Sequence, residues 1–313
     1  MFYQIENEYL SASISEFGAT LTKLIDKKTG VDLVLGFDNE EDLIRNKDCF
    51  IGASVGRNCN RIGNAAFTLN GIKYDLTVND NMNQLHGGDG FAHKMWKLID
   101  KKDDELVLGL SSKDGEEGFP GNMEVQVSYK LDKNTLTWSY SGTTDKDTVF
   151  NMTNHSYFSL GDKNIFNQKL KVHTDKYSPT DEYCLTLKDA VDVTGTPYDF
   201  KEFTLFNDNL SKLDKGIDNN YVFEVMGDKL MAELTNDKLQ LNVYSDLPDM
   251  HLYTSYNLHT DTSKDNRAYG KYDAVCLECQ FYPNSINYEG YIKPILKKGE
   301  TASHYIRYEV IEK

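Results

Sequence analysis

The sequence predicts an all-β protein built as a large antiparallel β-sandwich. Its regular segments are short, alternate apolar and polar residues with a period of two, and are separated by turn residues along the whole length. Helical periodicity is scarce, NEEDLIRN at residues 39–46 being one of few short helices expected, which argues against an α/β fold. The chain shows no fixed-period repeat and no low-complexity linker, so we expect residues 1–313 to form one domain.

Two hairpins can be placed from local patterns. In residues 65–76, the pair Asn70-Gly71 joins two alternating runs, which is the strongest short-range hairpin signal because both residues tolerate positive φ. A second hairpin is expected in residues 123–140, where two alternating runs flank a polar turn at residues 132–134. Antiparallel pairing should therefore dominate the sheets.

Composition restricts the partners of the chain. An apolar fraction of 39%, with 20 Tyr and 15 Phe, is typical of a folded globular protein. The net charge of −15 and the lack of clustered basic residues argue against nucleic acid and against an anionic membrane surface. No run approaches the ~18 apolar residues of a membrane-spanning helix. We therefore expect neither nucleic acid nor a membrane as a partner.

The cysteines and the first residues indicate a compartment. The five cysteines are too few, and odd in number, for a disulfide framework, so we expect free thiols. The opening MFYQIENEYLSASI lacks the basic start, apolar run and small-residue cleavage site of a secretory signal. Together these features predict a cytoplasmic protein.

Residues 149–160 predict a strand with two different faces, because successive side chains alternate across a strand. The apolar face holds Phe150, Met152, Phe158 and Leu160, and the polar face holds Asn151, Thr153, His155 and Tyr157. A single histidine is more often a satisfied structural residue than a catalyst. The polar neighbours of His155 favour a functional role, since histidine is the side chain best suited to donate a proton near neutral pH.

Residues 272–287 hold a carboxylate inside an apolar strand. Alternation places Glu278 on the same face as Cys276 and on the opposite face from Cys279. Burial of a carboxylate is costly unless the group is paired or used, which makes Glu278 a candidate for chemistry. The Cys276-x-x-Cys279 spacing is weak evidence for a metal or redox site, because in a strand the two sulfur atoms point in opposite directions.

Two stretches gather polar side chains beside a Gly-Gly turn. They are GRNCNRIGNAAF from residue 56 and NQLHGGDGF from residue 83, and they supply Arg57, Asn60, Arg61, Asn83 and His86. The fixed fork of donors on an arginine suits oxygen-rich ligands. The alternative, that Arg61 pairs with a surface carboxylate and the glycines only form a loop, stays open at this point.

Other polar residues carry a weaker signal. Asp218 in GIDNNYVF, and His251 and Tyr253 in DMHLYTSYNL, can equally be turn residues or half-buried strand residues. The chain has no Gly-x-Gly-x-x-Gly, no Walker-type loop, no Gly-x-Ser-x-Gly elbow and no His-Glu-x-x-His. Nucleotide cofactors and serine or zinc hydrolysis therefore lose support.

Taken in order, the motifs GRNCNRIG, NQLHGG, NHSYFSL, GIDNNYVF and LECQFYPNSIN resemble those of the aldose 1-epimerase family, the galactose mutarotases. The similarity runs from about Phe17 to the C-terminus and includes the framework stretches GEEGFPGN and GTPYDF. The resemblance implies a galactose mutarotase-like supersandwich with a sugar bound in an open cleft on one concave sheet. It implies a monosaccharide substrate, no metal, no organic cofactor, and a monomer or homodimer.

The resemblance also implies roles for individual residues. His155 matches the general acid and Glu278 the general base that open and close the sugar ring. The positions that hold the hydroxyl groups of the sugar are matched by Arg61, His86 and Asp218, with Asn60 placing Arg61.

One departure from the family pattern concerns the choice of sugar. Where many relatives carry Gln in a Gln-x-Tyr-Thr pattern, this chain has His251 before Leu252, Tyr253 and Thr254. Both side chains can bind a sugar hydroxyl, but an imidazole has a different reach and can become charged, so His251 puts the substrate preference in doubt. Asn219 also stands where a histidine often follows the aspartate.

The leading interpretation is an aldose 1-epimerase acting on free hexoses such as galactose and glucose. One alternative, a hexose-6-phosphate 1-epimerase, requires several convergent basic groups, and the chain offers Arg57 and Arg61 without a further cluster. A second alternative is a non-catalytic carbohydrate-binding sandwich, which needs no acid and base pair. A glycosidase usually needs two carboxylates, whereas the best pair here is a histidine and a glutamate.

Overall fold

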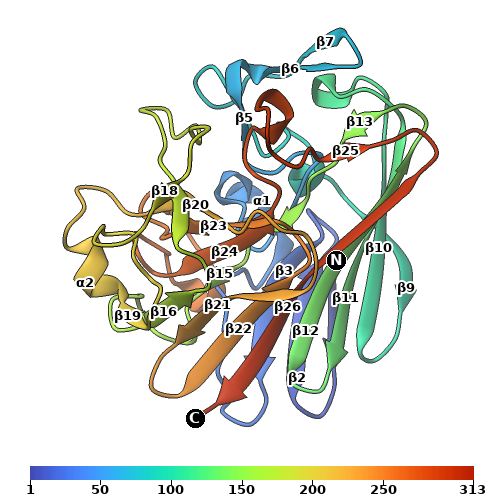
Figure 1. The fold of residues 1–313 in the computed structure, drawn as a ribbon. Helices are drawn as coiled ribbons and strands as arrows, with labels where there is room; N and C mark the ends of the chain where they lie inside the picture. Colours follow the sequence, from blue (N-terminus) through green and yellow to red (C-terminus); the bar gives the residue numbers. More distant parts are fainter.

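Two large antiparallel sheets form the body of the protein in the computed structural model, which describes residues 1–313 (Figure 1). The nine-stranded sheet has the order β19 (Thr204–Leu205), β16 (Lys169–Val172), β21 (Lys229–Thr235), β22 (Leu239–Ser245), β26 (Thr301–Glu312), β12 (Thr135–Thr144), β11 (Met123–Asp132), β10 (Glu105–Ser112), β9 (Lys97–Lys101). The six-stranded sheet has the order β15 (Tyr157–Phe158), β24 (Val275–Gln280), β23 (Asp249–Tyr253), β20 (Asp218–Val222), β17 (Lys176–Ser178), β18 (Val191–Asp192). The predicted antiparallel β-sandwich is thus confirmed.

Smaller sheets complete the strand inventory. One has three strands, β1 (Phe2–Glu6), β2 (Leu10–Ser15) and β3 (Thr20–Asp26). Four pairs are β13 (Thr148–Val149) with β25 (Ile295–Leu296), β14 (Thr153–Asn154) with β4 (Ser54–Val55), β5 (Arg61–Ile62) with β8 (Gln84–Leu85), and β6 (Ala66–Leu69) with β7 (Ile72–Asp75). The β5–β8 pair is the one that brings the two predicted polar stretches together.

Helices are few and short. The α-helices are α1 (Glu40–Arg45) and α2 (Phe206–Leu210), and the single-turn 3₁₀ helices are Lys47–Cys49, Gly63–Ala65, Phe91–His93, Glu116–Gly118, Lys264–Asn266 and Ser285–Asn287. The helix predicted at residues 39–46 is confirmed as α1, and Asn39 caps it by accepting the backbone N–H of Asp42 at 2.8 Å. None of these helices has the length and apolar character required to cross a membrane.

The core lies between the two large sheets. A single cluster of 52 buried apolar residues takes members from both of them, so one continuous core joins the sheets. In the central hairpin β11–β12, alternate side chains enter this core. These side chains are Val125, Val127, Tyr129, Leu136, Trp138 and Tyr140, as the period-two pattern predicts.

Both predicted hairpins form, with one difference at a turn. Asn70 and Gly71 have φ values of 53° and 77° and join β6 to β7, which confirms the first hairpin. In the second hairpin the predicted turn at residues 132–134 begins one residue too early. Asp132 still pairs with Thr135 across the ladder, so the loop contains only two residues.

The prediction of one continuous strand over residues 149–160 is wrong. The segment is divided into β13, β14 and β15, which pair with β25, β4 and β24 in turn, because the chain changes partner twice as it crosses between sheets. Its alternation nevertheless holds on the apolar side, since Phe150, Met152, Phe158 and Leu160 all lie in the main core. His155 therefore sits in the short connection between β14 and β15.

A buried tyrosine links the nine-stranded sheet to β14, and loss of its hydroxyl group should weaken the fold. Tyr129 donates its hydroxyl to the carbonyl of Ala19 at 2.6 Å and accepts from Asn154 Nδ2 at 3.1 Å. We expect Tyr129→Phe to lower the free energy of unfolding by about 1–3 kcal/mol, because the buried carbonyl of Ala19 and the buried amide of Asn154 each lose one hydrogen bond. Urea denaturation measures this change.

The exposed Tyr9, whose hydroxyl makes no hydrogen bond, provides the control for this experiment. Tyr9→Phe should change the free energy of unfolding by less than about 0.5 kcal/mol. Equal, small effects of the two substitutions would contradict the structural role given to the Tyr129 hydroxyl.

Candidate active site

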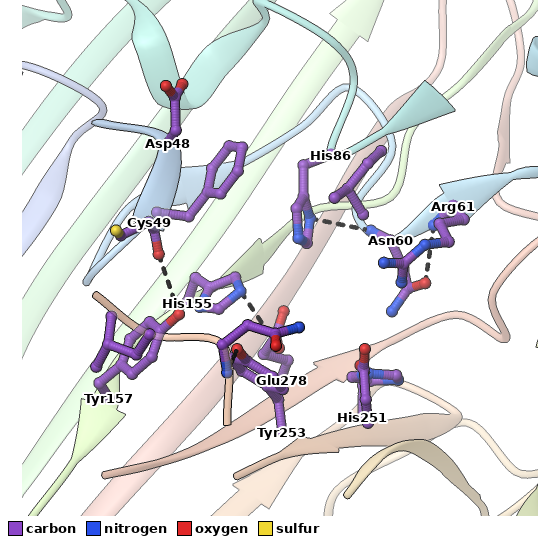
Figure 2. Close-up of a pocket in the computed structure, with 15 residues that line it drawn as sticks. Asp48, Cys49, Asn60, Arg61, His86, His155, Tyr157, His251, Tyr253 and Glu278 are labelled. Carbon is purple, nitrogen blue, oxygen red and sulfur yellow. Dashed lines mark hydrogen bonds and ion pairs between the residues drawn. The ribbon is translucent and has the colours of Figure 1, made fainter. Parts of the chain in front are cut away.

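A cavity of about 220 Å³ opens on the face of the six-stranded sheet that points away from the core (Figure 2). Fifteen residues line it. All seven candidates from the sequence are among them: Asn60, Arg61, His86, His155, Asp218, His251 and Glu278. The volume suits a ligand the size of one sugar ring.

Strand register explains how the floor of the cavity forms. His251 of β23 lies directly opposite Glu278 of β24, and directly opposed side chains share a face of the sheet. Asp218 begins β20 and lies opposite Tyr253 of β23. Leu277, next to Glu278 in sequence, points to the other face and joins the main core. Alternation therefore places polar groups in the cavity and anchors the same strands in the core.

His155 and Glu278 face each other at the centre of the cavity, with His86 on one side of them and Arg61 farther along (Figure 2). His155 Nε2 lies 3.6 Å from Glu278 Oε1, and both side chains are almost completely buried. The imidazole stacks on Tyr157, with ring centroids 5.2 Å apart and planes inclined by 22°. Stacking and burial thus hold the ring edge toward the carboxyl group.

Burial shifts the two ionisable groups toward their uncharged forms. It raises the pKa of Glu278 well above its ordinary value, with a further contribution from the negative charge of Asp218. It lowers the pKa of His155 to about 4. When the pair holds one proton, burial thus favours its position on the carboxyl group. The same single proton on the imidazole would create an ion pair ready to act as acid and base.

His86 is fixed in one tautomer by Asn60. The backbone N–H of Asn60 donates to His86 Nδ1 at 3.2 Å, and the backbone N–H of His86 donates to the carbonyl of Asn60 at 3.2 Å. Burial holds the pKa of His86 well below its usual value, so the ring is neutral and carries its proton on Nε2. His86 therefore offers the cavity a hydrogen-bond donor.

The tautomer of His86 also bears on metal binding. Ligand atoms of His86, His155 and Glu278 lie within 4.8 Å of one another, a spacing that suits a metal ion. A metal-bound histidine nitrogen must carry no proton. Since Nδ1 of His86 already accepts a backbone N–H, its proton is on Nε2, and this donor set does not fit a metal ion.

Arg61 combines the two roles considered from the sequence. Its Nε donates to the carboxylate of Asp80 at 2.7 Å, as expected for pairing with a nearby carboxylate. Its two Nη groups make no hydrogen bond to the protein and line the cavity, where they can bind oxygen atoms. Asn60 accepts the backbone N–H of Arg61 on Oδ1 at 2.8 Å, so the expected contact between these neighbours is present.

Asp218 and His251 form a second close pair. His251 Nε2 lies 2.6 Å from Asp218 Oδ1. Burial alone would raise the pKa of Asp218, but the hydrogen bond from His251 and the positive charge of Arg61 outweigh it and lower that pKa. Asp218 therefore stays ionised and can accept hydrogen bonds from hydroxyl groups. Its pKa is lowered, whereas that of Glu278 is raised.

Two of the polar residues noted in the sequence lie outside the cavity. Arg57 is buried and donates to Ser112 Oγ and to the carbonyls of Lys113 and Pro120, so it braces a loop. Asn83 accepts the backbone N–H of Asn64 and is likewise structural. Arg57 is therefore not available to bind a phosphate, because its donors are already used inside the protein.

Phe50 is a lining residue that the sequence analysis missed. Its ring centroid lies 4.7 Å from that of His86 and 6.1 Å from that of His155, so it covers both imidazoles. It follows the 3₁₀ helix Lys47–Cys49 in a left-handed conformation, with φ of 54°. No sequence signal marked it, because an apolar residue near a loop is ordinarily assigned to packing.

Comparison with known proteins finds relatives over almost the whole chain. A family model described as aldose 1-epimerase matches residues 1–309. The chain is 33% identical to aldose 1-epimerase of Escherichia coli strain K12, over 97% of the chain and 93% of that protein. It is 32% identical to galactose mutarotase of Bos taurus, over 96% of the chain and 91% of that protein.

Comparison with solved structures agrees with the family match. An aldose epimerase homologue from C. elegans superposes with a TM-score of 0.94 at 26% identity, covering 100% of this chain and 99% of that chain. Galactose 1-epimerase from Lactobacillus acidophilus NCFM superposes with a TM-score of 0.88 at 27% identity, covering 99% of this chain and 93% of that chain.

The raised pKa of Glu278 predicts that this residue costs stability. We expect Glu278→Gln to have a higher free energy of unfolding than the wild type at neutral pH. The folded state holds the carboxyl proton more tightly than the unfolded state, so wild-type stability falls as pH rises from the unfolded pKa toward the folded one. Below both pKa values the carboxyl group is protonated in both states, and the two proteins should converge.

Urea denaturation over a range of pH measures this difference. Glu182, which is exposed and outside the cavity, provides the control, because Glu182→Gln should show no gain that grows with pH. A Glu278→Gln protein less stable than wild type at neutral pH would contradict the assignment of Glu278 as a carboxyl group destabilised by burial.

Proposed function

The chain belongs to the aldose 1-epimerase family and interconverts the α and β anomers of aldoses, and we propose that His155 and Glu278 catalyse this reaction on free galactose and glucose. The observation that carries the proposal is the 3.6 Å separation of His155 Nε2 and Glu278 Oε1 in the cavity. An acid and a base this close can serve two oxygens on one carbon, which in an aldose are the ring oxygen and the C1 hydroxyl.

The proposed reaction begins with an imidazolium on His155 and a carboxylate on Glu278. Glu278 takes the proton of the C1 hydroxyl while His155 gives its proton to the ring oxygen. The bond between C1 and the ring oxygen breaks, and C1 becomes the carbonyl carbon of an open-chain aldehyde. Rotation about the C1 to C2 bond presents the other face of the carbonyl, and the reverse proton transfers close the ring as the other anomer.

The proton inventory of the pair fits this cycle. Ring opening moves one proton from His155 to Glu278 by way of the sugar, and ring closure returns it, so no exchange with solvent is required. Burial makes the product arrangement, with neutral imidazole and protonated carboxyl, the favoured one in the free protein. Attraction between the charged forms at 3.6 Å opposes that preference.

We assign the surrounding groups to holding the sugar hydroxyls. Arg61 and His86 offer N–H donors, while the ionised carboxylate of Asp218 accepts hydrogen bonds from sugar hydroxyl groups. His251 holds the carboxylate of Asp218 and lies opposite Glu278, so it can affect which epimer fits. Asn60 acts through its contacts with Arg61 and His86.

The alternative functions receive less support. A hexose-6-phosphate 1-epimerase needs convergent basic groups, but Arg57 is committed to a loop and Arg61 already pairs with Asp80. A non-catalytic carbohydrate-binding protein has no need to bury an acid and base pair that lowers stability. Rapid turnover of phosphorylated hexoses in preference to free ones would favour a hexose-6-phosphate 1-epimerase.

The proposal extends to organisation and location. We propose that residues 1–313 act as one domain, because the cavity takes its lining from residues 48 to 278 of a single chain. One chain supplies every proposed group, so a monomer suffices and a homodimer is compatible.

We propose a cytoplasmic location because all five cysteines are free thiols, which suits a reducing compartment.

Removal of the proposed base should abolish most of the activity. We expect Glu278→Gln to reduce kcat by about 10²- to 10⁴-fold, the range typical of a positioned proton acceptor, because the amide keeps the shape but cannot take a proton. His155→Asn should have a similar effect. Polarimetry on freshly dissolved α-D-galactose and α-D-glucose measures the rate, and sugar binding to both variants is followed by calorimetry.

Glu182→Gln is the matched control and should retain wild-type turnover, since this side chain lies outside the cavity. Wild-type turnover in Glu278→Gln would remove Glu278 from the mechanism. If the wild type binds the sugar but does not accelerate interconversion of its anomers, the protein is a carbohydrate-binding protein instead.

His251 should influence the choice between epimeric sugars. We expect His251→Gln to change the ratio of kcat/KM for galactose over glucose by about three- to tenfold, roughly the contribution of one hydrogen bond. His304, which pairs with Asp246 at 2.9 Å on the nine-stranded sheet, is the matched control, and His304→Gln should leave the ratio unchanged. An unaltered ratio in His251→Gln would show that this position does not select the sugar.

A further inference from the structure

Four neighbouring buried side chains on the cavity-facing side of the six-stranded sheet share an unusual property. They are Asn220 of β20, His251 of β23, and Glu278 and Gln280 of β24, and they hold five of the 17 buried side-chain polar atoms that have no hydrogen-bond partner in the protein. Register places Asn220 opposite His251 and His251 opposite Glu278, while Gln280 lies two residues along on the same face. The atoms without partners are therefore grouped on one patch of the sheet.

The unpaired atoms are complementary in kind. In its neutral form, His251 donates Nε2–H to the carboxylate of Asp218 and leaves Nδ1 as an acceptor. Gln280 Oε1 already accepts from Cys59 Sγ at 3.2 Å, so its free atom is the donor Nε2. Asn220 has both its donor and its acceptor free, and Glu278 has Oε2 free. The patch thus offers two N–H donors and several acceptors.

We propose that an internal water binds among these four side chains, and that Asn220 thereby acts as a positioning residue for Glu278. The water accepts from Asn220 Nδ2 and Gln280 Nε2 and donates to His251 Nδ1 and Glu278 Oε2, which uses all four of its hydrogen bonds. Buried polar groups in folded proteins are normally paired with protein or ordered water, and no protein group reaches these atoms.

The position of this site separates it from the sugar. Glu278 and His251 line the cavity, whereas Asn220 and Gln280 share their face of the sheet but are fully buried and do not line it, so the proposed water lies beside the cavity and not in it. A hydrogen bond to Oε2 fixes the plane of the carboxyl group and leaves Oε1 directed at His155. It also favours the carboxylate form that takes the proton in ring opening. The catalytic part of this inference rests on the proposed role of Glu278.

Two substitutions at Asn220 distinguish this role from simple packing. Asn220→Leu keeps the volume but offers the water no hydrogen bond, whereas Asn220→Ser leaves a hydroxyl and room for a second water. We expect Asn220→Leu to lower kcat by about tenfold or more and to move the alkaline limb of the pH–rate profile, where the carboxyl proton is lost, to higher pH, and Asn220→Ser to stay close to wild type. Asp218, Arg61 and His155, which also face Glu278, are unchanged in both variants.

If Asn220 served packing alone, kcat would be higher in Asn220→Leu than in Asn220→Ser, since serine would leave a cavity and leucine would fill it. Higher kcat for Asn220→Leu than for Asn220→Ser, or an alkaline limb that does not move in Asn220→Leu, would therefore overturn the positioning role. Asn242 of β22, which is buried and bonded to Glu309 at 3.0 Å far from the cavity, is the matched control, and Asn242→Ser should leave kcat and the pH profile unaltered.

A high-resolution crystal structure of the wild-type protein tests the water itself, independently of any activity and of whether the variants fold. Electron density for a water within hydrogen-bond distance of Asn220 and Glu278 Oε2 is the expected result. Direct contact between these side chains with no water between them would overturn the proposal. Failure of the wild type to accelerate mutarotation would instead refute the proposed function, and the crystallographic result would still stand.

Discussion

The constraint on which the rest of this structure depends is the burial of the Glu278 carboxyl group. It lies in the middle of β24, whose other face is packed into the main apolar core through Leu277 and Cys279. A strand anchored in this way cannot move its carboxyl group into water, so the desolvation persists and the pKa of Glu278 stays high. The two-sheet core is therefore the means by which an ordinary glutamate becomes a strong base once it is ionised.

The cavity contains two buried carboxyl groups whose surroundings separate their roles. Asp218 receives a hydrogen bond from His251 and is close to Arg61, and its pKa is lowered despite burial. Glu278 has only His155 at 3.6 Å and one oxygen without a protein partner, and its pKa is raised. Environment, not residue type, thus makes one group a permanent anion suited to binding and the other a group that exchanges a proton.

The imidazoles show the same division. His86 is fixed by Asn60 in a neutral form with its proton on Nε2, and it can only donate. His155 has no hydrogen bond at Nδ1 and stacks between aromatic rings, so its protonation state can change without breaking a bond to the protein. A rigid donor beside a ring free to gain and lose a proton is what sugar ring opening requires.

The sequence by itself determined the strand periodicity and the antiparallel sandwich, because alternation is a local property of the backbone, and its resemblance to the aldose 1-epimerase motifs identified the seven candidate side chains of the cavity. It could not place chain segments that depend on distant partners. Residues 149–160 break into three pieces because their partners β25, β4 and β24 come from remote parts of the chain. Arg57 braces a loop and does not line the cavity, and Phe50, which no sequence signal marked, covers the imidazoles, because such positions follow from three-dimensional packing. The pairing of Asp218 with His251 and the shifted pKa of Glu278 likewise exist only after folding, since desolvation and hydrogen bonding act between groups that the chain brings together from far apart.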